Sequence, residues 1–122
     1  MVRQTVMKNR KSKAVPVFVG RYRRTVGEQG RIRFPADWLP LLGDDGELFV
    51  LPNPDGTKTL LAVLATDYRK EANPPPATLL KVASDGFMSV PMRLLAHAGI
   101  TSKVCLLGKI RMVELSAITS AT

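Results

Sequence analysis

Aromatic residues, cysteine and long apolar runs are all scarce in this chain of 122 residues. Aromatic side chains make up 6% of the residues, which argues against an RNA-binding platform built from stacked bases. A single cysteine excludes an internal disulfide and is typical of proteins in a reducing cytosol. No stretch reaches the roughly eighteen apolar residues that a membrane span needs, and the N-terminal segment lacks a signal-peptide pattern. We therefore expect a cytoplasmic protein with no membrane partner.

Groups that could carry catalysis or hold a metal are also few. His97 is the one histidine, and Cys105 lies in an apolar run that is typical of a small buried side chain. Asp44 and Asp45 precede a glycine but lack the spaced ligands of a metal loop, so they indicate a turn. No nucleophile–base grouping, paired catalytic carboxylates or phosphate-binding glycine loop appears. We expect no enzyme activity, no cofactor, no metal and no small-molecule substrate.

Acidic residues are nearly absent from the first quarter of the chain. Residues 1–33 carry ten lysines and arginines against one acid, Glu28, whereas residues 34–122 carry eight basic and nine acidic residues. The net charge of +8 is therefore +9 in the first segment and −1 in the rest. A positive field this localised attracts polyanions, although a basic tail can also serve solubility. Nucleic acid is the favoured partner, and composition does not separate DNA from RNA.

Glycine, proline and leucine recur at a spacing of 56 residues. Gly30 matches Gly86, Pro35 matches Pro91, Gly43 matches Gly99, Leu39 matches Leu95, and residues 48–51 match residues 104–107. Matching glycines and prolines reflect backbone requirements, so the pattern indicates two copies of one structural unit.

Each copy reads as a strand, a turn, a short strand, a short helix and a hairpin. In the first copy we expect a strand over 17–26, a turn over 27–30, a strand over 31–34, a helix from Pro35 to Gly43, and a hairpin of 48–51 with 60–64. In the second copy we expect the hairpin to turn near Lys109 and to continue over 110–115.

The chain divides into a basic arm over 1–16, one domain over 17–116 and a C-terminal tail over 117–122. Within the domain, half-repeat one spans 17–72, a proline-rich linker spans 73–76, and half-repeat two spans 77–116. One half-repeat is too small to bury its own apolar face, and two can complete a common core. We expect a mainly β fold with short helices (α+β), in which the two half-repeats form a pseudo-twofold barrel.

Two segments at this spacing resemble the signatures of the MraZ family. They are Gly27-Glu28-Gln29-Gly30-Arg31-Ile32-Arg33-Phe34-Pro35 and Ala83-Ser84-Asp85-Gly86-Phe87-Met88-Ser89-Val90-Pro91. Phe18-Val19-Gly20 is similar to the opening Phe-x-Gly of the family, and Ala98-Gly99-Ile100 to its Ala-Gly-Leu. The signature Asp that would brace the arginine is Gly27 here.

The resemblance implies an AbrB-like swapped-hairpin β-barrel that binds double-stranded DNA. It implies a sequence-specific transcriptional regulator, a repressor of a division and cell-wall gene cluster or a related operon, that associates with the nucleoid. It further implies a homo-oligomer, with a ring as the family form, and assigns Arg31 to DNA. Two alternatives stay open: an AbrB-like antitoxin or accessory DNA-binding protein, and a basic RNA-associated structural protein.

The DNA-binding residues are expected in the first half-repeat. Because strand side chains alternate, burial of Ile32 and Phe34 turns Arg31 and Arg33 outward, and Arg21 and Arg23 share a face for the same reason. The full expected set is Arg21, Arg23, Arg24, Arg31 and Arg33, with Lys11 and Lys13 of the arm.

In the second half-repeat the five arginine positions hold non-basic residues, namely Ala77, Leu79, Leu80, Phe87 and Ser89. The apolar residues at these positions can belong to the core, or can be exposed and form a contact between protomers. We expect the second for Phe87, because its register is outward.

Overall fold

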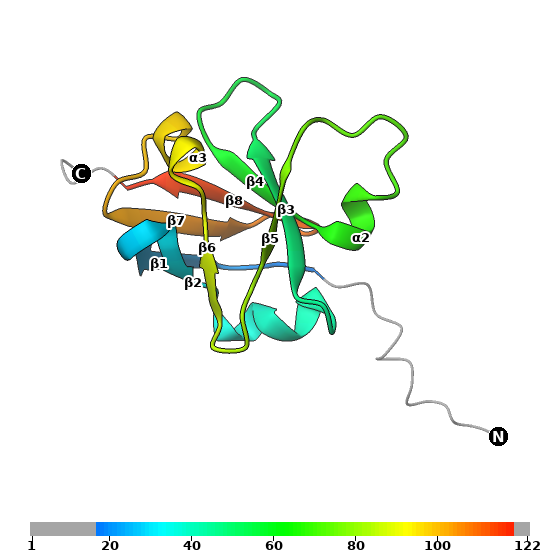
Figure 1. The fold of residues 1–122 in the computed structure, drawn as a ribbon, viewed down its shortest axis with the longest axis horizontal. Coiled ribbons are helices and arrows are strands. Elements are labelled where there is room, and N and C mark those ends of the chain that lie inside the picture. The colour runs from blue at the N-terminus through cyan, green and yellow to red at the C-terminus, as the bar shows by residue number, and fades with distance from the viewer. Residues whose placement is uncertain (1–16, 119–122) are drawn as a thin grey trace.

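The computed structural model describes residues 17–118. Within this range the chain forms eight strands and a few short helices, with the strands in two antiparallel sheets (Figure 1). The expected class, mainly β with short helices, is confirmed at this level. The larger sheet is not a closed barrel, since β1 and β5 remain at its two edges. In the described range no helix has the length and apolar character needed to cross a bilayer.

The two halves contain the same series of strands around a short helix. The first half comprises β1 (Arg21–Thr25), the 3₁₀ turn η1 (Glu28–Gly30), β2 (Arg31–Arg33), the 3₁₀ helix η2 (Ala36–Leu42), β3 (Glu47–Pro52), β4 (Leu60–Leu64) and α2 (Ala65–Tyr68). The second half comprises β5 (Thr78–Lys81), β6 (Phe87–Ser89), α3 (Met92–His97), β7 (Lys103–Gly108) and β8 (Met112–Ala117).

Strands of the two halves interleave in both sheets. The six-stranded sheet has the order β1-β7-β8-β4-β3-β5, and β2 pairs with β6 in a two-stranded ribbon. Because β1, β7 and β8 are the counterparts of β5, β3 and β4, the order read from one edge mirrors the order read from the other. Each sheet therefore contains strands from both halves of the chain.

The pairing of individual residues shows the same symmetry between the two halves. Arg23 pairs with Cys105, and their counterparts 56 positions away, Leu79 and Phe49, pair with each other. The two halves are thus related by a pseudo-twofold axis in register as well as in strand order.

The helix after Pro35 forms as expected and begins at Ala36. Pro40 has no N–H to donate and its ring obstructs an α-helical bond, so the segment is a 3₁₀ helix. Gly43 ends it with a φ of 78°, a conformation that glycine adopts without a steric penalty.

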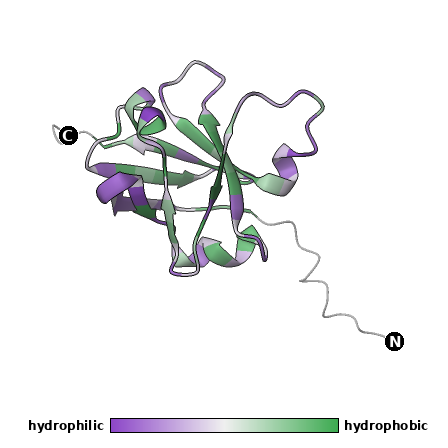
Figure 2. Ribbon diagram, viewed as in Figure 1, coloured by the Kyte–Doolittle hydropathy of each residue, from purple (hydrophilic) through white to green (hydrophobic). Residues whose placement is uncertain are grey.

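The core lies between the larger sheet and the β2–β6 ribbon, which runs across β7 in Figure 1. Leu48, Leu106 and Leu115 contribute fully buried side chains from the larger sheet, and Ile32 and Met88 from the ribbon. In Figure 2 hydrophobic colour predominates along β4 and β7, and hydrophilic colour along β1 and η1.

An aromatic cluster anchors η2 beneath β1. The ring of Trp38 makes edge contacts with Phe18, Tyr22 and Phe34, at centroid distances of 5.6, 5.0 and 5.7 Å. Its indole Nε1 donates to the Val19 carbonyl at 3.0 Å. These four rings all belong to the first half, so the half that carries the arginines also contains this aromatic cluster.

The first strand is shorter than the sequence predicts. A continuous strand from Val17 was expected, but β1 begins at Arg21 because Gly20 interrupts the extended backbone with a φ of 106°. Phe18 instead forms an isolated bridge with Ile110.

The last hairpin also differs from the expectation. Ile110 has a φ of 70° and lies in the turn, so β8 begins at Met112 and not at residue 110. The strand continues to Ala117, one residue past the expected end of the second half-repeat.

Candidate nucleic-acid interface

The β2–β6 ribbon presents the clearest arginine-bearing face of the described structure. Its register places Arg31 opposite Ser89 and Arg33 opposite Phe87. Between these pairs, Ile32 and Met88 point into the core with 0% and 1% of their surfaces exposed. Since neighbouring side chains on a strand point to opposite faces, the other four side chains share the outer face. The prediction that Ile32 points inward beside outward arginines is confirmed.

Phe87 lies under both arginines. The guanidinium carbon of Arg31 is 4.2 Å from the centre of the Phe87 ring, and that of Arg33 is 5.7 Å away. Both distances are within the range of a cation–π interaction, which orients a guanidinium group over the face of a ring. Phe87 is half-buried as a result. The outward register expected for Phe87 is observed, and the expected contact between protomers stays a prediction.

Asp85 holds Arg31 from the side. Its Oδ2 accepts a hydrogen bond from Nη2 of Arg31 at 3.3 Å, with 48% of the arginine side chain and 57% of the aspartate side chain exposed. Its Oδ1 accepts from the backbone N–H of Phe87 at 3.0 Å, which fixes the carboxylate at the start of β6. An exposed pair of this kind contributes only about 0–1 kcal/mol, so Arg31 can exchange Asp85 for a phosphate or a base.

Arg24 performs a different task from the other arginines. Its Nε donates to the carbonyl of Arg33 at 3.2 Å, and its Nη1 donates to the carbonyl of Arg23 at 3.0 Å. Its guanidinium carbon lies 5.3 Å from the centre of the Tyr22 ring. Arg24 thus links β1 to β2, and its counterpart Leu80 is buried in the core. The expectation that Arg24 belongs to the DNA-binding group stays a prediction, with two of its nitrogens occupied.

Arg21 and Arg23 are exposed on edge strand β1, opposite Leu107 and Cys105 of β7. Among residues 17–118, no acidic side chain lies within salt-bridge distance of Arg21, Arg23 or Arg33. This face of β1 therefore carries uncompensated positive charge. It is the face opposite to Tyr22 and Arg24, whose side chains point toward η2 and β2. The expected contacts of Lys11 and Lys13 lie outside the described residues.

Tyr22 adds a polar contact beside this face. Its hydroxyl donates to Oδ2 of Asp37 at 3.0 Å. This hydrogen bond to the carboxylate raises the pKa of Tyr22, with smaller contributions from partial burial and from the negative charge of Asp37. Tyr22 therefore stays neutral and joins β1 to η2.

The remaining candidate groups lie apart from one another. His97 is exposed on α3, and Cys105 is half-buried rather than buried because it lies on the outer face of β7 beside Arg23. Among residues 17–118 no three His, Cys, Asp or Glu side chains come together in a way that could hold a metal ion.

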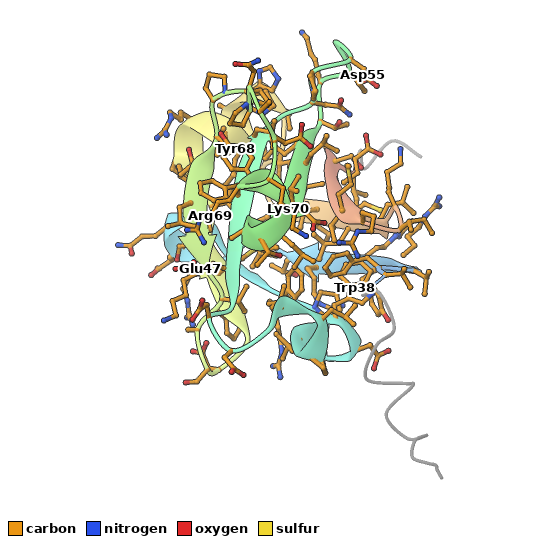
Figure 3. All side chains as sticks on the ribbon, turned by 90° about the vertical axis from the view of Figure 1, so that its right-hand side faces the viewer. Trp38, Glu47, Asp55, Tyr68, Arg69 and Lys70 are labelled. Carbon is orange, nitrogen blue, oxygen red and sulfur yellow. The ribbon has the colours of Figure 1, made fainter. Side chains whose placement is uncertain are left out.

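A cleft of about 480 Å³ lies beside α2, on the outer face of the larger sheet. Its floor consists of apolar side chains, and one side is closed by Arg111, which donates to both oxygens of Asp67 at 2.8 and 2.7 Å. Figure 3 shows Tyr68, Arg69 and Lys70 together on this side of the molecule, with Glu47 next to Arg69. The lining includes no histidine, cysteine or serine.

Sequence reasoning did not identify Asp85 and Phe87 as supports of the arginines. The sequence contained a usable signal, because the 56-residue repeat makes Ile32 and Met88 counterparts, and pairing them sets Arg33 opposite Phe87. The register alone does not place Asp85 beside Arg31, because the residue opposite Arg31 is Ser89, and the contact arises from the reach of the arginine side chain.

A comparison of the chain with protein-family models gave no match, and a search of curated proteins gave none either.

Proposed function

We propose that this chain is a sequence-specific regulator of transcription that binds double-stranded DNA through the outer face of its β2–β6 ribbon. The observation that carries the proposal is the pair Arg31 and Arg33, side by side on a short exposed ribbon and ordered over one aromatic ring. A two-stranded ribbon fits the major groove of B-DNA, and an arginine fork can bind a guanine edge or a phosphate at two points.

The fold proposed for this regulator is an AbrB-like swapped-hairpin barrel of the MraZ type. The mirrored strand order and the exchange of β1 and β5 between the halves support it. In this proposal the protein acts as a cytoplasmic, nucleoid-associated repressor of a division and cell-wall gene cluster or a related operon. One ribbon supplies few base contacts, so a homo-oligomer reading repeated sites would provide the selectivity.

Arg21 and Arg23 would extend the contact along the phosphate backbone. They lie on β1, with their side chains on the face that points away from β2, and they lack an acidic partner within the described range. Contacts to phosphate position a protein on the duplex, whereas contacts to base edges select the sequence. In this division of labour β1 orients the protein and β2 reads the groove.

The experiment is a binding titration of the full chain against duplex DNA and single-stranded RNA at several salt concentrations. The DNA pool is randomised, so that the preferred sequence is selected and then used as the probe. The proposal requires tighter binding to the selected duplex than to scrambled duplex or RNA. Arg31→Ala and Arg33→Ala are compared with Arg93→Ala, which removes one positive charge from α3 outside the ribbon. Equal losses in all three variants would reduce the interaction to net charge and contradict the proposal.

A second candidate is an AbrB-like antitoxin or accessory protein whose second half binds another protein. Leu79 favours it, because this counterpart of Arg23 leaves 45% of its surface exposed on edge strand β5. Co-expression with the product of a neighbouring gene and co-purification would test it, with Leu79→Lys as the disrupting variant. Preferential binding to single-stranded RNA would instead favour an RNA-associated protein.

A further inference from the structure

Two residues of the non-basic half touch the arginines of the basic half. Phe87 lies beneath Arg31 and Arg33, and Asp85 accepts a hydrogen bond from Arg31 at 3.3 Å. Asp85 also binds the backbone N–H of Phe87, so the two supports form one unit at the start of β6. The second half thus supplies the surface on which the arginines lie.

We infer that Phe87, together with Asp85, is a positioning platform that sets the orientation of the Arg31 and Arg33 guanidinium groups before DNA binds. This inference rests on the proposed function. It gives the second half a role in DNA recognition without placing a basic residue there, and it assigns to the ring of Phe87 a task inside the chain rather than between chains.

The register explains why an arginine would not serve at position 87. Arg33 lies directly opposite Phe87, and position 87 is the counterpart of Arg31. A second arginine there would place like charges directly opposite each other on one short ribbon, which destabilises the pairing of strands. A phenylalanine removes that repulsion and offers a π face to which both guanidinium groups are attracted.

Ordering before binding improves affinity because an arginine has many rotamers. A side chain that must be immobilised in the complex loses conformational entropy, and one that is already oriented loses less. The exposed faces of Arg31 and Arg33 remain available to a ligand, since Asp85 occupies one side of Arg31 and the ring occupies the underside. The platform therefore orders the arginines without covering them.

The experiment compares Phe87→Leu, which keeps an apolar side chain but removes the ring, with Phe87→Tyr, which keeps the ring. Asp85→Asn tests the charged brace and retains an oxygen for the Phe87 N–H, and Ser84→Ala is the matched control in the same turn. Each variant is measured for duplex DNA affinity across a salt series, for thermal unfolding, and for oligomer size. The free proteins are also examined by NMR, because a ring above or below a guanidinium group shifts its side-chain proton resonances upfield.

We expect Phe87→Leu to weaken duplex binding by about tenfold, because the two arginine side chains must then lose their rotamer freedom when DNA binds. Its salt slope should stay unchanged because no phosphate contact is lost, whereas Arg31→Ala lowers that slope by about one if Arg31 binds a phosphate. The upfield shift of the Arg31 and Arg33 side chains should disappear in Phe87→Leu and persist in Phe87→Tyr and Ser84→Ala. Asp85→Asn should weaken binding less and should alter the Arg31 resonances rather than those of Arg33.

Four results would overturn the inference. The first is a wild-type protein without the ring-induced shift. The second is a Phe87→Leu variant that loses the shift but keeps its affinity within twofold. The third is a change of oligomer size that accounts for the whole loss of affinity, which would make Phe87 a contact between protomers. The fourth is a wild-type protein that shows the shift but does not bind duplex DNA, which would remove the proposed function and with it the role of the platform. Should Phe87→Leu fail to fold, the DNA affinity and the Arg31 resonances of Asp85→Asn test the inference instead. That variant should fold because the Asp85 side chain is exposed.

Discussion

Ile32 and Met88 lie directly opposite each other on β2 and β6, and both are buried. They are also counterparts in the 56-residue repeat, so the pseudo-twofold axis of the chain passes between them. Because strand side chains alternate, the burial of this pair turns Arg31, Arg33 and Phe87 to the outer face. The burial of this one pair thereby sets the orientation of the proposed DNA-binding face.

The glycines beside this axis differ in how much space they have. A Cβ on Gly30 would lie 2.1 Å from the Val90 carbonyl oxygen, whereas a Cβ on its counterpart Gly86 would come no closer than 3.7 Å to Leu39. Both have positive φ, at 74° and 87°. We expect Gly86→Ala to lower the free energy of unfolding by about 1–2 kcal/mol, from backbone strain alone. Gly30→Ala should cost roughly 3 kcal/mol or more, because the backbone at Val90, directly after β6, must also move. Denaturant unfolding of both variants tests this, and equal costs would contradict the asymmetry.

Removing the Arg31 side chain should weaken binding to the preferred duplex by on the order of 1–3 kcal/mol if it contacts a base. The fold should be unaffected because the side chain is about half exposed and its salt bridge is weak. Affinities for the preferred and a scrambled duplex, measured side by side, give the selectivity. A base contact predicts a larger loss on the preferred site, and an equal loss on both would indicate a phosphate contact.

Deleting residues 1–15 should flatten the salt dependence of DNA binding and leave the sequence preference intact. The segment carries five basic residues and no acid, and each neutralised phosphate contributes roughly 0.9 to the salt slope. The measurement is the affinity for one preferred and one scrambled duplex over a salt series. A change in the preferred sequence would mean that this segment reads a groove.

The chain should assemble into a complex larger than a dimer. One ribbon offers two arginines to a duplex, and several ribbons on repeated sites raise the effective concentration of each. Native mass spectrometry or light scattering at micromolar concentration tests the prediction. A monomer under these conditions would be incompatible with a ring and would leave selectivity to a single ribbon.

The Tyr22–Asp37 hydrogen bond should appear in an alkaline titration. The carboxylate stabilises the neutral phenol, so the pKa of Tyr22 is raised in the folded chain. A group of this kind contributes stability that is fully present below its unfolded pKa, about 10, and is lost as the pH rises through the higher folded value. Absorbance of the phenolate in a Tyr68→Phe background reports Tyr22 alone. Asp37→Asn should move the transition to lower pH, and an unchanged transition would exclude the bond in solution.

Local pattern was sufficient for the strands and for which side chains of β2 point outward, whereas the short helix α2 was not predicted. Alternation around Ile32 predicted the exposed arginines of β2, and the repeat predicted the same series of strands in both halves. Pro40 predicted a short helix, which forms as a 3₁₀ segment. These features follow from the backbone preferences and polarity of neighbouring residues, which a sequence states directly. Where a single residue changed the backbone, as Gly20 did at the start of β1, the predicted boundary was wrong.

The partners of the arginines were decided by the tertiary structure alone. Asp85 is 54 positions from Arg31, and their contact exists because β2 pairs with β6 across the two halves. Arg24 shares its strand and its charge with Arg23, yet it faces β2 and donates to the carbonyl of Arg33 there and to the carbonyl of Arg23 on its own strand. Leu79 and Leu80 are neighbours of similar polarity, and one is exposed at an edge while the other is buried. Composition and repeat spacing placed the positive charge on the first half of the chain. Which of those charges stay free, and which are held by the second half, depends on the register of strands far apart in the chain, which no local periodicity encodes.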